Sequence, residues 1–316
     1  MSEAVDVLVV GGGPAGLSAA AAAASTGAGV LLVDEQAELG GNLRYRAQRI
    51  ADETGAAAAP GDLRARLIAE AEASGVDLRP GVLAAGWYPG GKVLLVEGEQ
   101  ARLVEPRAMI VASGSTDLPF PFAGATLPGV FTARALQILM NQWRVRPGLR
   151  FAVIGVGPEA EEVTIDILLA GGEVIWGGVA PPPHLTASGS NGVEQFAIGE
   201  ERYEVDCVVI AVGRQADPAL ATMAGATLGF AGPLGGLVPV LSAELRAAPG
   251  VFVAGDAAGV GSVAAAIAEG RLAGAAAAET LGRSDANAAQ ATSNPEVGWR
   301  IATRETLAPV YAQPYT

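Results

Sequence analysis

The glycine-rich segment Gly11–Gly16 constrains the fold of this chain more than any other feature of its sequence. It follows the apolar, β-branched run Val5–Val10 and opens a run of small residues with high helix propensity, Pro14–Thr26. A second apolar run, Gly29–Asp34, comes next. This order predicts one strand–helix–strand unit with parallel strands, and therefore an α/β fold.

The spacing of the glycines predicts a dinucleotide site at this turn. The pattern GxGxxG comprises Gly11, Gly13 and Gly16, with Pro14 and Ala15 inside it. Gly11 permits the tight turn, Gly13 lets the backbone approach a pyrophosphate, and Gly16 lets helix and strand pack closely. Asp34 follows Gly11 by 23 positions, where a carboxylate accepts hydrogen bonds from ribose hydroxyls. The alternative is a glycine-rich turn of purely structural use.

A second motif lies late in the chain. Gly255 and Asp256 follow the apolar run Val251–Ala254, and a helix of small residues is expected from about residue 261 to 281. This order resembles the strand–GD–helix motif of flavoproteins that have two dinucleotide domains. An Asp at this place is also a plausible helix N-cap. Together with the first motif, it favours FAD over NAD at the amino-terminal site.

A strand–helix–strand pattern recurs in the middle of the chain. Phe151–Ile154 is followed by a GxGxxA motif (Gly155, Gly157 and Ala160), a helix expected over 159–170 and a strand over 173–176. The position 23 residues after Gly155 is Gly178, not an acid, and Glu159 places negative charge near the helix N-terminus. We expect a retained fold with an altered or empty site; a second nucleotide, NAD(P) or ATP, is the alternative.

The repeated pattern indicates a diverged internal duplication. We predict two Rossmann-like, three-layer dinucleotide-binding domains, the second inserted in the first: an FAD-binding domain over residues 1–118 and 245–316, and an NAD(P)-binding-like domain over 119–244. The segment from Ala112 through Ser113 to Gly114 is one expected crossing between them. The tail 283–316 either docks on a partner or packs on its own domain.

Composition excludes several classes of chemistry. A single Cys (Cys207) and a single His (His184) allow no disulfide within the chain, no CxxC pair and no Cys/His metal site. The net charge of −13 disfavours nucleic acid as a partner. No run of 18 apolar residues is free of helix breakers, so we expect no transmembrane segment. The cytoplasm is the expected location, with peripheral membrane attachment through a complex left open.

Three local strings narrow the class: Val33-Asp34-Glu35-Gln36 with Gly40-Gly41, Leu127-Pro128-Gly129-Val130-Phe131-Thr132, and Gly155-Val156-Gly157-Pro158. With the glycine motifs they resemble glutathione-reductase-like flavoproteins. In particular they are similar to the FAD-containing subunit shared by heteromeric sarcosine oxidase, dye-linked L-proline dehydrogenase, hydroxyproline dehydrogenase, opine oxidase and hydrogen cyanide synthase. The resemblance spans about residues 4–282.

The resemblance implies an FAD-dependent oxidoreductase subunit that transfers electrons within a heteromeric complex. A second flavoprotein subunit, of the D-amino-acid-oxidase type, would oxidise the secondary amine or amino acid, and a small [2Fe-2S] subunit or domain would lie on another chain. The expected FAD-binding residues are Gly11, Gly13, Pro14, Ala15, Gly16, Asp34, Glu35, Gly41, Asn42, Ala112, Ser113, Gly114, Gly255 and Asp256.

No catalytic acid or base stands out, and the role of His184 stays open. Disulfide reductases of this fold need two cysteines near the flavin, which this chain lacks. Two further hypotheses are a stand-alone NAD(P)H-dependent flavin reductase for a ferredoxin or quinone, and a non-redox scaffold that holds nucleotides for assembly.

Overall fold

The computed structural model describes residues 3–283, 294–305 and 307. The chain divides into two compact units. Unit 1 contains the described residues of Met1–Arg44, Arg49–Ser115 and Gln215–Thr316, and unit 2 comprises Tyr45–Gln48 and Thr116–Arg214. Segment 215–244, which the sequence pattern assigns to the inserted domain, lies in unit 1. The assignment of one nucleotide type to each domain stays a prediction.

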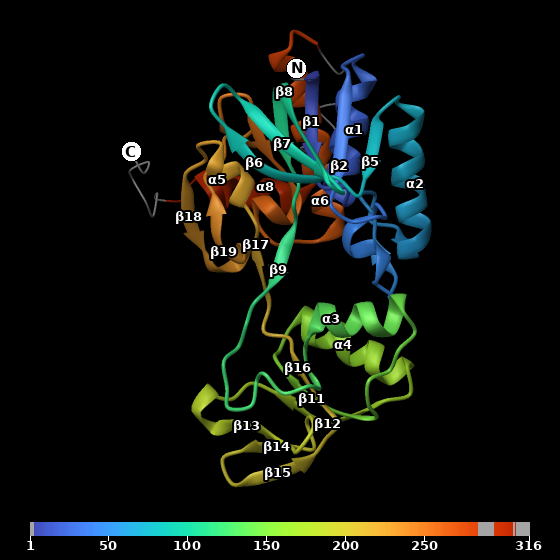
Figure 1. The fold of residues 1–316 in the computed structure, drawn as a ribbon, viewed down its shortest axis with the longest axis vertical. Helices are drawn as coiled ribbons and strands as arrows, with labels where there is room; N and C mark the ends of the chain where they lie inside the picture. Colours follow the sequence, from blue (N-terminus) through green and yellow to red (C-terminus); the bar gives the residue numbers. More distant parts are fainter. Residues whose placement is uncertain (1–2, 284–293, 306, 308–316) are drawn as a thin grey trace. The chain divides into compact units, whose positions relative to one another are not determined.

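Unit 1 is built on a mixed sheet. Among its described residues, eight strands join in the order β20-β21-β8-β1-β2-β5, with the hairpin β6–β7 attached through β8 (Figure 1). The strands are β1 (Glu3–Val10), β2 (Val30–Asp34), β5 (Asp77–Pro80), β6 (Leu83–Tyr88), β7 (Lys92–Glu97), β8 (Gln100–Val111), β20 (Arg246–Ala248) and β21 (Val251–Val253). The central strand β1 pairs in parallel with β2 and β8. Its residues 7–9 are fully buried, which explains their continuous apolar sequence.

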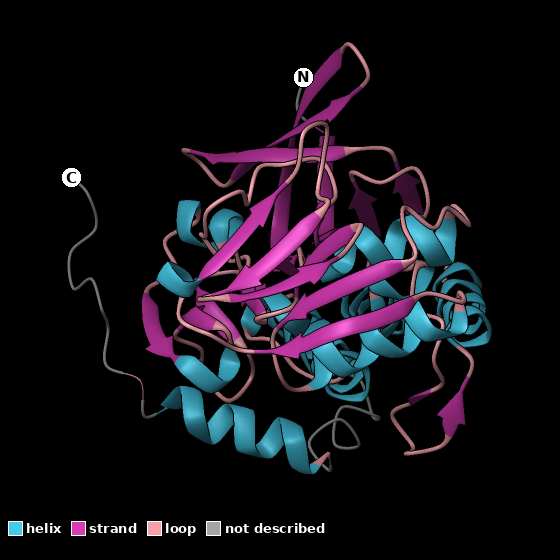
Figure 2. Ribbon diagram, turned by 90° about the horizontal axis from the view of Figure 1, so that it is seen from below, coloured by secondary structure: helices cyan, strands magenta, loops and turns pink. Residues whose placement is uncertain are grey.

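The helices of unit 1 lie against this sheet (Figure 2). They are α1 (Pro14–Ser25), α2 (Pro60–Ala73), α5 (Ala219–Met223), α6 (Val263–Thr280) and α8 (Pro295–Glu305). Smaller elements are β3 (Ile50–Ala51), β4 (Ala57–Ala58), β18 (Leu228–Ala231), β19 (Gly236–Pro239) and 3-10 turns at Gly41–Arg44, Gly232–Leu234 and Gly255–Ala258. The predicted strand–helix–strand unit is confirmed, and α2 begins at Pro60, three residues before its predicted start, because proline suits the first helical position.

Unit 2 has a parallel sheet of its own, in the order β10-β16-β11-β12, and an antiparallel meander β13-β14-β15. Its strands are β10 (Val130–Thr132), β11 (Arg150–Ile154), β12 (Glu173–Gly178), β13 (Leu185–Ser188), β14 (Gln195–Ile198), β15 (Glu201–Glu204) and β16 (Cys207–Ile210). Its helices are α3 (Ala133–Gln137), continued as a π-turn over Ile138–Gln142, α4 (Pro158–Leu169) and a 3-10 turn at Pro182–His184. The chain crosses between the units at β9 (Ser115–Asp117) and β17 (Arg214–Ala216).

Alternation along β11 gives unit 2 two small cores. Phe151 and Val153 pack with residues of α4, whereas Ala152 and Ile154 face the cluster that contains Phe196 of the meander. The predicted α/β class and the repeated strand–helix pattern are therefore confirmed, and the meander is an addition that the sequence pattern did not predict.

Candidate functional site

The turn between β1 and α1 has the tight geometry that its glycines predict. Gly11 has a φ of +107°, and a Cβ atom there would lie 2.2 Å from the carbonyl oxygen of Ala112. A Cβ atom at Gly16 would lie 1.8 Å from the carbonyl oxygen of Gly11. Neither position accepts a side chain without moving backbone atoms. The turn thus brings the start of α1 against the end of β8.

Gly13 differs from its neighbours because its Cβ direction is open. The nearest atom to a Cβ placed there is the Cα of Gly41, at 3.8 Å. Pro14 occupies the first turn of α1, which has neither a side-chain cap on Gly13 nor an acidic residue. The helix therefore presents its positive end and its first amide groups to the space beside Gly13, as anion binding requires.

Asp34, at the end of β2, is tied to this turn. Its Oδ2 accepts a hydrogen bond from the Gly12 amide (2.6 Å), and its Oδ1 accepts one from the Gln36 amide (2.7 Å). Burial raises the pKa of the Asp34 carboxyl, and the two backbone hydrogen bonds only partly oppose that rise. Its neighbour Glu35 is exposed. Asp34 thus sits at the rim of the turn as the carboxylate that the motif predicts.

The 3-10 turn Gly41–Arg44 lies on the other side of Gly13. Within the described part of the chain, the buried Oδ1 atom of Asn42 has no hydrogen-bond partner. A buried, unsatisfied amide oxygen is rare in native proteins and often marks a ligand contact. With the open cradle at Gly13, it shows that the predicted residues fit a dinucleotide pyrophosphate.

The late motif joins the same place. Gly255 has a φ of +70°, and a Cβ atom there would lie 2.6 Å from the Cβ of Ala15 in α1. The Oδ2 of Asp256 accepts a hydrogen bond from the Ser115 hydroxyl (2.9 Å), which follows the crossing segment Ala112–Gly114. Ser113 in that segment donates to the Asp217 carbonyl oxygen (2.6 Å). The structure therefore gathers both predicted flavin motifs and the crossing segment around the start of α1.

The corresponding turn in unit 2 has the same backbone but different chemistry. A Cβ atom at Gly155 would lie 1.9 Å from the carbonyl oxygen of Ala211, and nothing lies within 4 Å of one at Gly157. However, Glu159 stands in the first turn of α4 and is paired with Arg214 (2.8 Å). Residue 178 is glycine, and Val179 after it is 58% exposed. Ala160 is buried. The carboxylate that β2 supplies in unit 1 has no counterpart at the end of β12.

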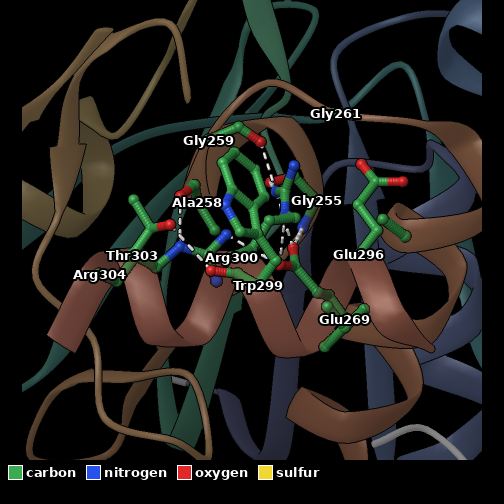
Figure 3. A network of polar contacts seen from close by, with 12 residues as sticks. Gly255, Ala258, Gly259, Gly261, Glu269, Glu296, Trp299, Arg300, Thr303 and Arg304 are labelled. Atoms are coloured by element: carbon green, nitrogen blue, oxygen red, sulfur yellow. Dashed lines mark hydrogen bonds and ion pairs between the residues drawn. The ribbon is translucent and has the colours of Figure 1, made fainter. Parts of the chain in front are cut away.

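A buried ionic cluster beside the late motif was not predicted from the sequence. Glu269 of α6 is fully buried, and its Oε1 accepts hydrogen bonds from Arg300 Nε and Arg304 Nη2 of α8, each at 2.8 Å (Figure 3). Burial raises the pKa of the Glu269 carboxyl, but the two arginines outweigh burial and lower it. The available signal was one acid within an Ala/Gly helix and arginines spaced by four in the tail.

The remaining candidates stand apart from this site. Cys207 is 1% exposed in β16, and burial raises the pKa of its thiol to about 12. His184 is exposed on the 3-10 turn of unit 2. The described residues contain no group of three or more His, Cys, Asp or Glu that could hold a metal ion. Over the same residues, no helix has the length and hydropathy needed to cross a membrane.

The family model of the pyridine nucleotide-disulphide oxidoreductases matches residues 5–176. The chain belongs to this family. Membership, together with the relatives described next, identifies it as an FAD-type oxidoreductase. The predicted glutathione-reductase-like fold and the resemblance to amine-oxidising flavoprotein subunits are confirmed by these matches.

Three similar proteins have names that bear on function. A subunit of opine oxidase from Rhizobium meliloti is 28% identical, and the match covers 93% of this chain and 66% of that protein. The alpha subunit of sarcosine oxidase from Corynebacterium sp. (strain P-1) is 34% identical over 54% of this chain and 19% of that protein. The structure of L-proline dehydrogenase from P. horikoshii superposes with a TM-score of 0.80 and 26% identity, covering 98% of this chain and 60% of that one. This chain thus spans less than the full length of each relative.

Proposed function

We propose that this chain is the FAD-containing subunit of a heteromeric dehydrogenase or oxidase that acts on a secondary amine or amino acid. The substrate class is proline, hydroxyproline, sarcosine or an opine. The observation that carries the proposal is the match to L-proline dehydrogenase over 98% of this chain, joined to relatives named as subunits of opine and sarcosine oxidase. We expect the complex in the cytoplasm.

In this proposal the chain's residues hold FAD and exclude competing chemistry. The amides at the start of α1 would bind the pyrophosphate, Asp34 the adenosine ribose, and Asp256 the ribityl chain. The expected contacts also include Glu35, Asn42 and Gly114. Bound FAD supplies an acceptor for two electrons. The sequence holds one cysteine, so a dithiol–disulfide centre within the chain is excluded.

Electron transfer rather than amine oxidation is the role proposed for this polypeptide. Amine oxidation is assigned to a second flavoprotein of the D-amino-acid-oxidase type, and a [2Fe-2S] centre to another chain. Direct reduction by NAD(P)H is disfavoured because Glu159 places a carboxylate at the start of α4, where a phosphate would bind.

One purification tests the proposal. The isolated chain, after release of its ligand and mass analysis, should contain FAD, oxidise no proline, sarcosine or opine with a dye acceptor, and keep its flavin oxidised with NADH. The native complex should contain a second flavoprotein. Amine turnover by the isolated chain would contradict the division of labour. Rapid flavin bleaching by NADH would select the flavin reductase hypothesis, and a nucleotide never reduced during turnover would select the scaffold.

A further inference from the structure

We propose that α8 is a positioning element for the segment Gly255–Ser262, and that Arg300 is its principal positioning residue. The segment carries Asp256 and the residue that caps α6. This inference rests on the proposed FAD site, because it assigns the carboxy-terminal helix a part in building that site. Arg300 acts through the backbone and needs no contact with the cofactor.

Arg300 fastens both ends of the 3-10 turn at Gly255–Ala258. Its Nη2 donates to the carbonyl oxygens of Gly255 (3.2 Å) and Gly259, and its Nε donates to Glu269. The Oε2 of Glu269 accepts the Gly255 amide (3.0 Å). The amide and the carbonyl of Gly255 are therefore both held by one buried ion pair (Figure 3). Because Arg300 is 1% exposed, water competes little for these contacts.

Two further residues of α8 hold the rest of the segment. Arg304 Nε donates to the Ala258 carbonyl oxygen (2.9 Å). The Oε1 of Glu296 accepts the Ser262 amide (2.9 Å), and its Oε2 accepts the Ser262 hydroxyl. Residues 296, 300 and 304 are spaced by four, so they share one face of the helix. The fixing of the segment is thus a property of that whole face.

The held segment places the groups assigned to the flavin. The amide of Gly261 donates to Asp256 Oδ1 (3.2 Å), so the segment orients that carboxylate. A Cβ atom at Gly261 would lie 1.9 Å from Arg300 Nη1, which shows how closely the arginine supports the backbone. Ser262 then accepts the Ala265 amide (3.1 Å) and starts α6. Fixing such groups before binding lowers the ordering cost of binding.

The test compares full-length variants for FAD affinity, by flavin fluorescence, and for hydrogen exchange of the apo chain over residues 255–262. Arg300→Met removes the fork, Arg300→Lys keeps the charge, and Glu296→Ala frees Ser262. Val297→Ala weakens the apolar packing of α8, since Val297 is buried with Ala265 and Ala268, but leaves the polar contacts. Ala302→Gln changes an exposed residue of the same helix as the control.

We expect Arg300→Met to raise the FAD dissociation constant by about 10- to 100-fold, as for loss of one charge-assisted hydrogen bond, and to speed exchange over 255–262. Arg300→Lys should recover part of the affinity. Val297→Ala should lower the melting temperature with less than about a threefold loss of affinity, and Ala302→Gln should match the wild type. The Val297 comparison separates positioning from general destabilisation.

Unchanged exchange and affinity in a folded Arg300→Met variant would overturn the inference. Equal affinity losses in Val297→Ala and Arg300→Met, at equal losses of melting temperature, would overturn it too. If Arg300→Met does not fold, Arg300→Lys and Glu296→Ala decide, because either should raise exchange over 255–262. If the wild-type chain binds no FAD, the proposed function fails, while the exchange of the apo chain still decides whether α8 fixes this segment.

Discussion

Asp34 lies at the rim of the glycine turn, and its charge is set by that position. Two backbone amides bind the carboxylate, yet burial raises its pKa. Ribose hydroxyls would donate to the charged form and so favour ionisation. FAD affinity should therefore fall as the pH drops through the pKa of Asp34 in the apo chain, because protonation removes the acceptor.

The same residue gives a mutational prediction. Asp34→Asn should weaken FAD binding by about 10- to 100-fold at pH 7, the usual effect of losing a charge-assisted hydrogen bond, and should flatten the acid limb of the affinity profile. Fluorescence titration from pH 4.5 to 8 measures both. Asp77→Asn, at an exposed position of β5, is the matched control. An Asp34→Asn affinity equal to that of the wild type would remove Asp34 from the site.

Glu53 makes stability depend on pH. Its two oxygens accept from Arg66 (2.8 Å each), and Arg271 of α6 donates to Oε1 (2.9 Å). Burial raises the pKa of the Glu53 carboxyl, but the arginines outweigh burial and bring it to about 2. An acid with a lowered pKa in the folded state stabilises above its unfolded pKa and loses that stabilisation as the pH falls toward 2.

Glu53→Gln should therefore lower the free energy of unfolding by about 1–2 kcal/mol at pH 7, a value discounted because both arginines are partly exposed. The difference from wild type should shrink as the pH falls from 4.5 toward 2. Urea unfolding at several pH values measures it. Glu72→Gln, an exposed neighbour on α2, should change little. A difference that does not depend on pH would contradict the assignment to the charged pair.

At the scale of elements, the packing of α1 on α6 depends on glycines of α6. A Cβ atom at Gly274 would lie 2.3 Å from the carbonyl oxygen of Ala19. Gly274→Ala should therefore destabilise unit 1 by about 1–3 kcal/mol through overpacking, although alanine favours helices. Gly298→Ala in α8 meets nothing within 4 Å and should stabilise by up to about 1 kcal/mol. Thermal unfolding of both variants checks the opposite signs.

Elements with strong local chemistry were predictable from the sequence. The segment from β1 through α1 to Asp34 combines an apolar strand, a glycine turn and an alanine-rich helix, so each part indicates the same structure. The cluster of Glu269 with Arg300 was not, because its partners lie 31 positions apart and their pairing depends on tertiary folding. The meander β13–β15 was missed because its strands have four residues each and are partly exposed.

At the scale of the whole chain, two similar turns have acquired different surroundings. The first turn of α1 contains no acid, and Asp34 follows β2. The first turn of α4 contains Glu159 and Glu161, and Val179 follows β12. A phosphate approaching α4 would meet carboxylates at the helix end that should attract it. The duplication thus predicts one competent nucleotide site, in unit 1.

Hydrogen exchange with added nucleotides tests that asymmetry on the intact chain. FAD should protect the peptides that contain Gly11–Gly16 and Gly255–Ser262, and at about a thousand times its dissociation constant it should stabilise the fold by about 4 kcal/mol. NADH, NADPH and ATP, each at about 1 mM, the upper end of typical enzyme affinities, should leave Gly155–Glu162 unprotected. Protection of that turn by any of the three would show that unit 2 retains a nucleotide site despite Glu159.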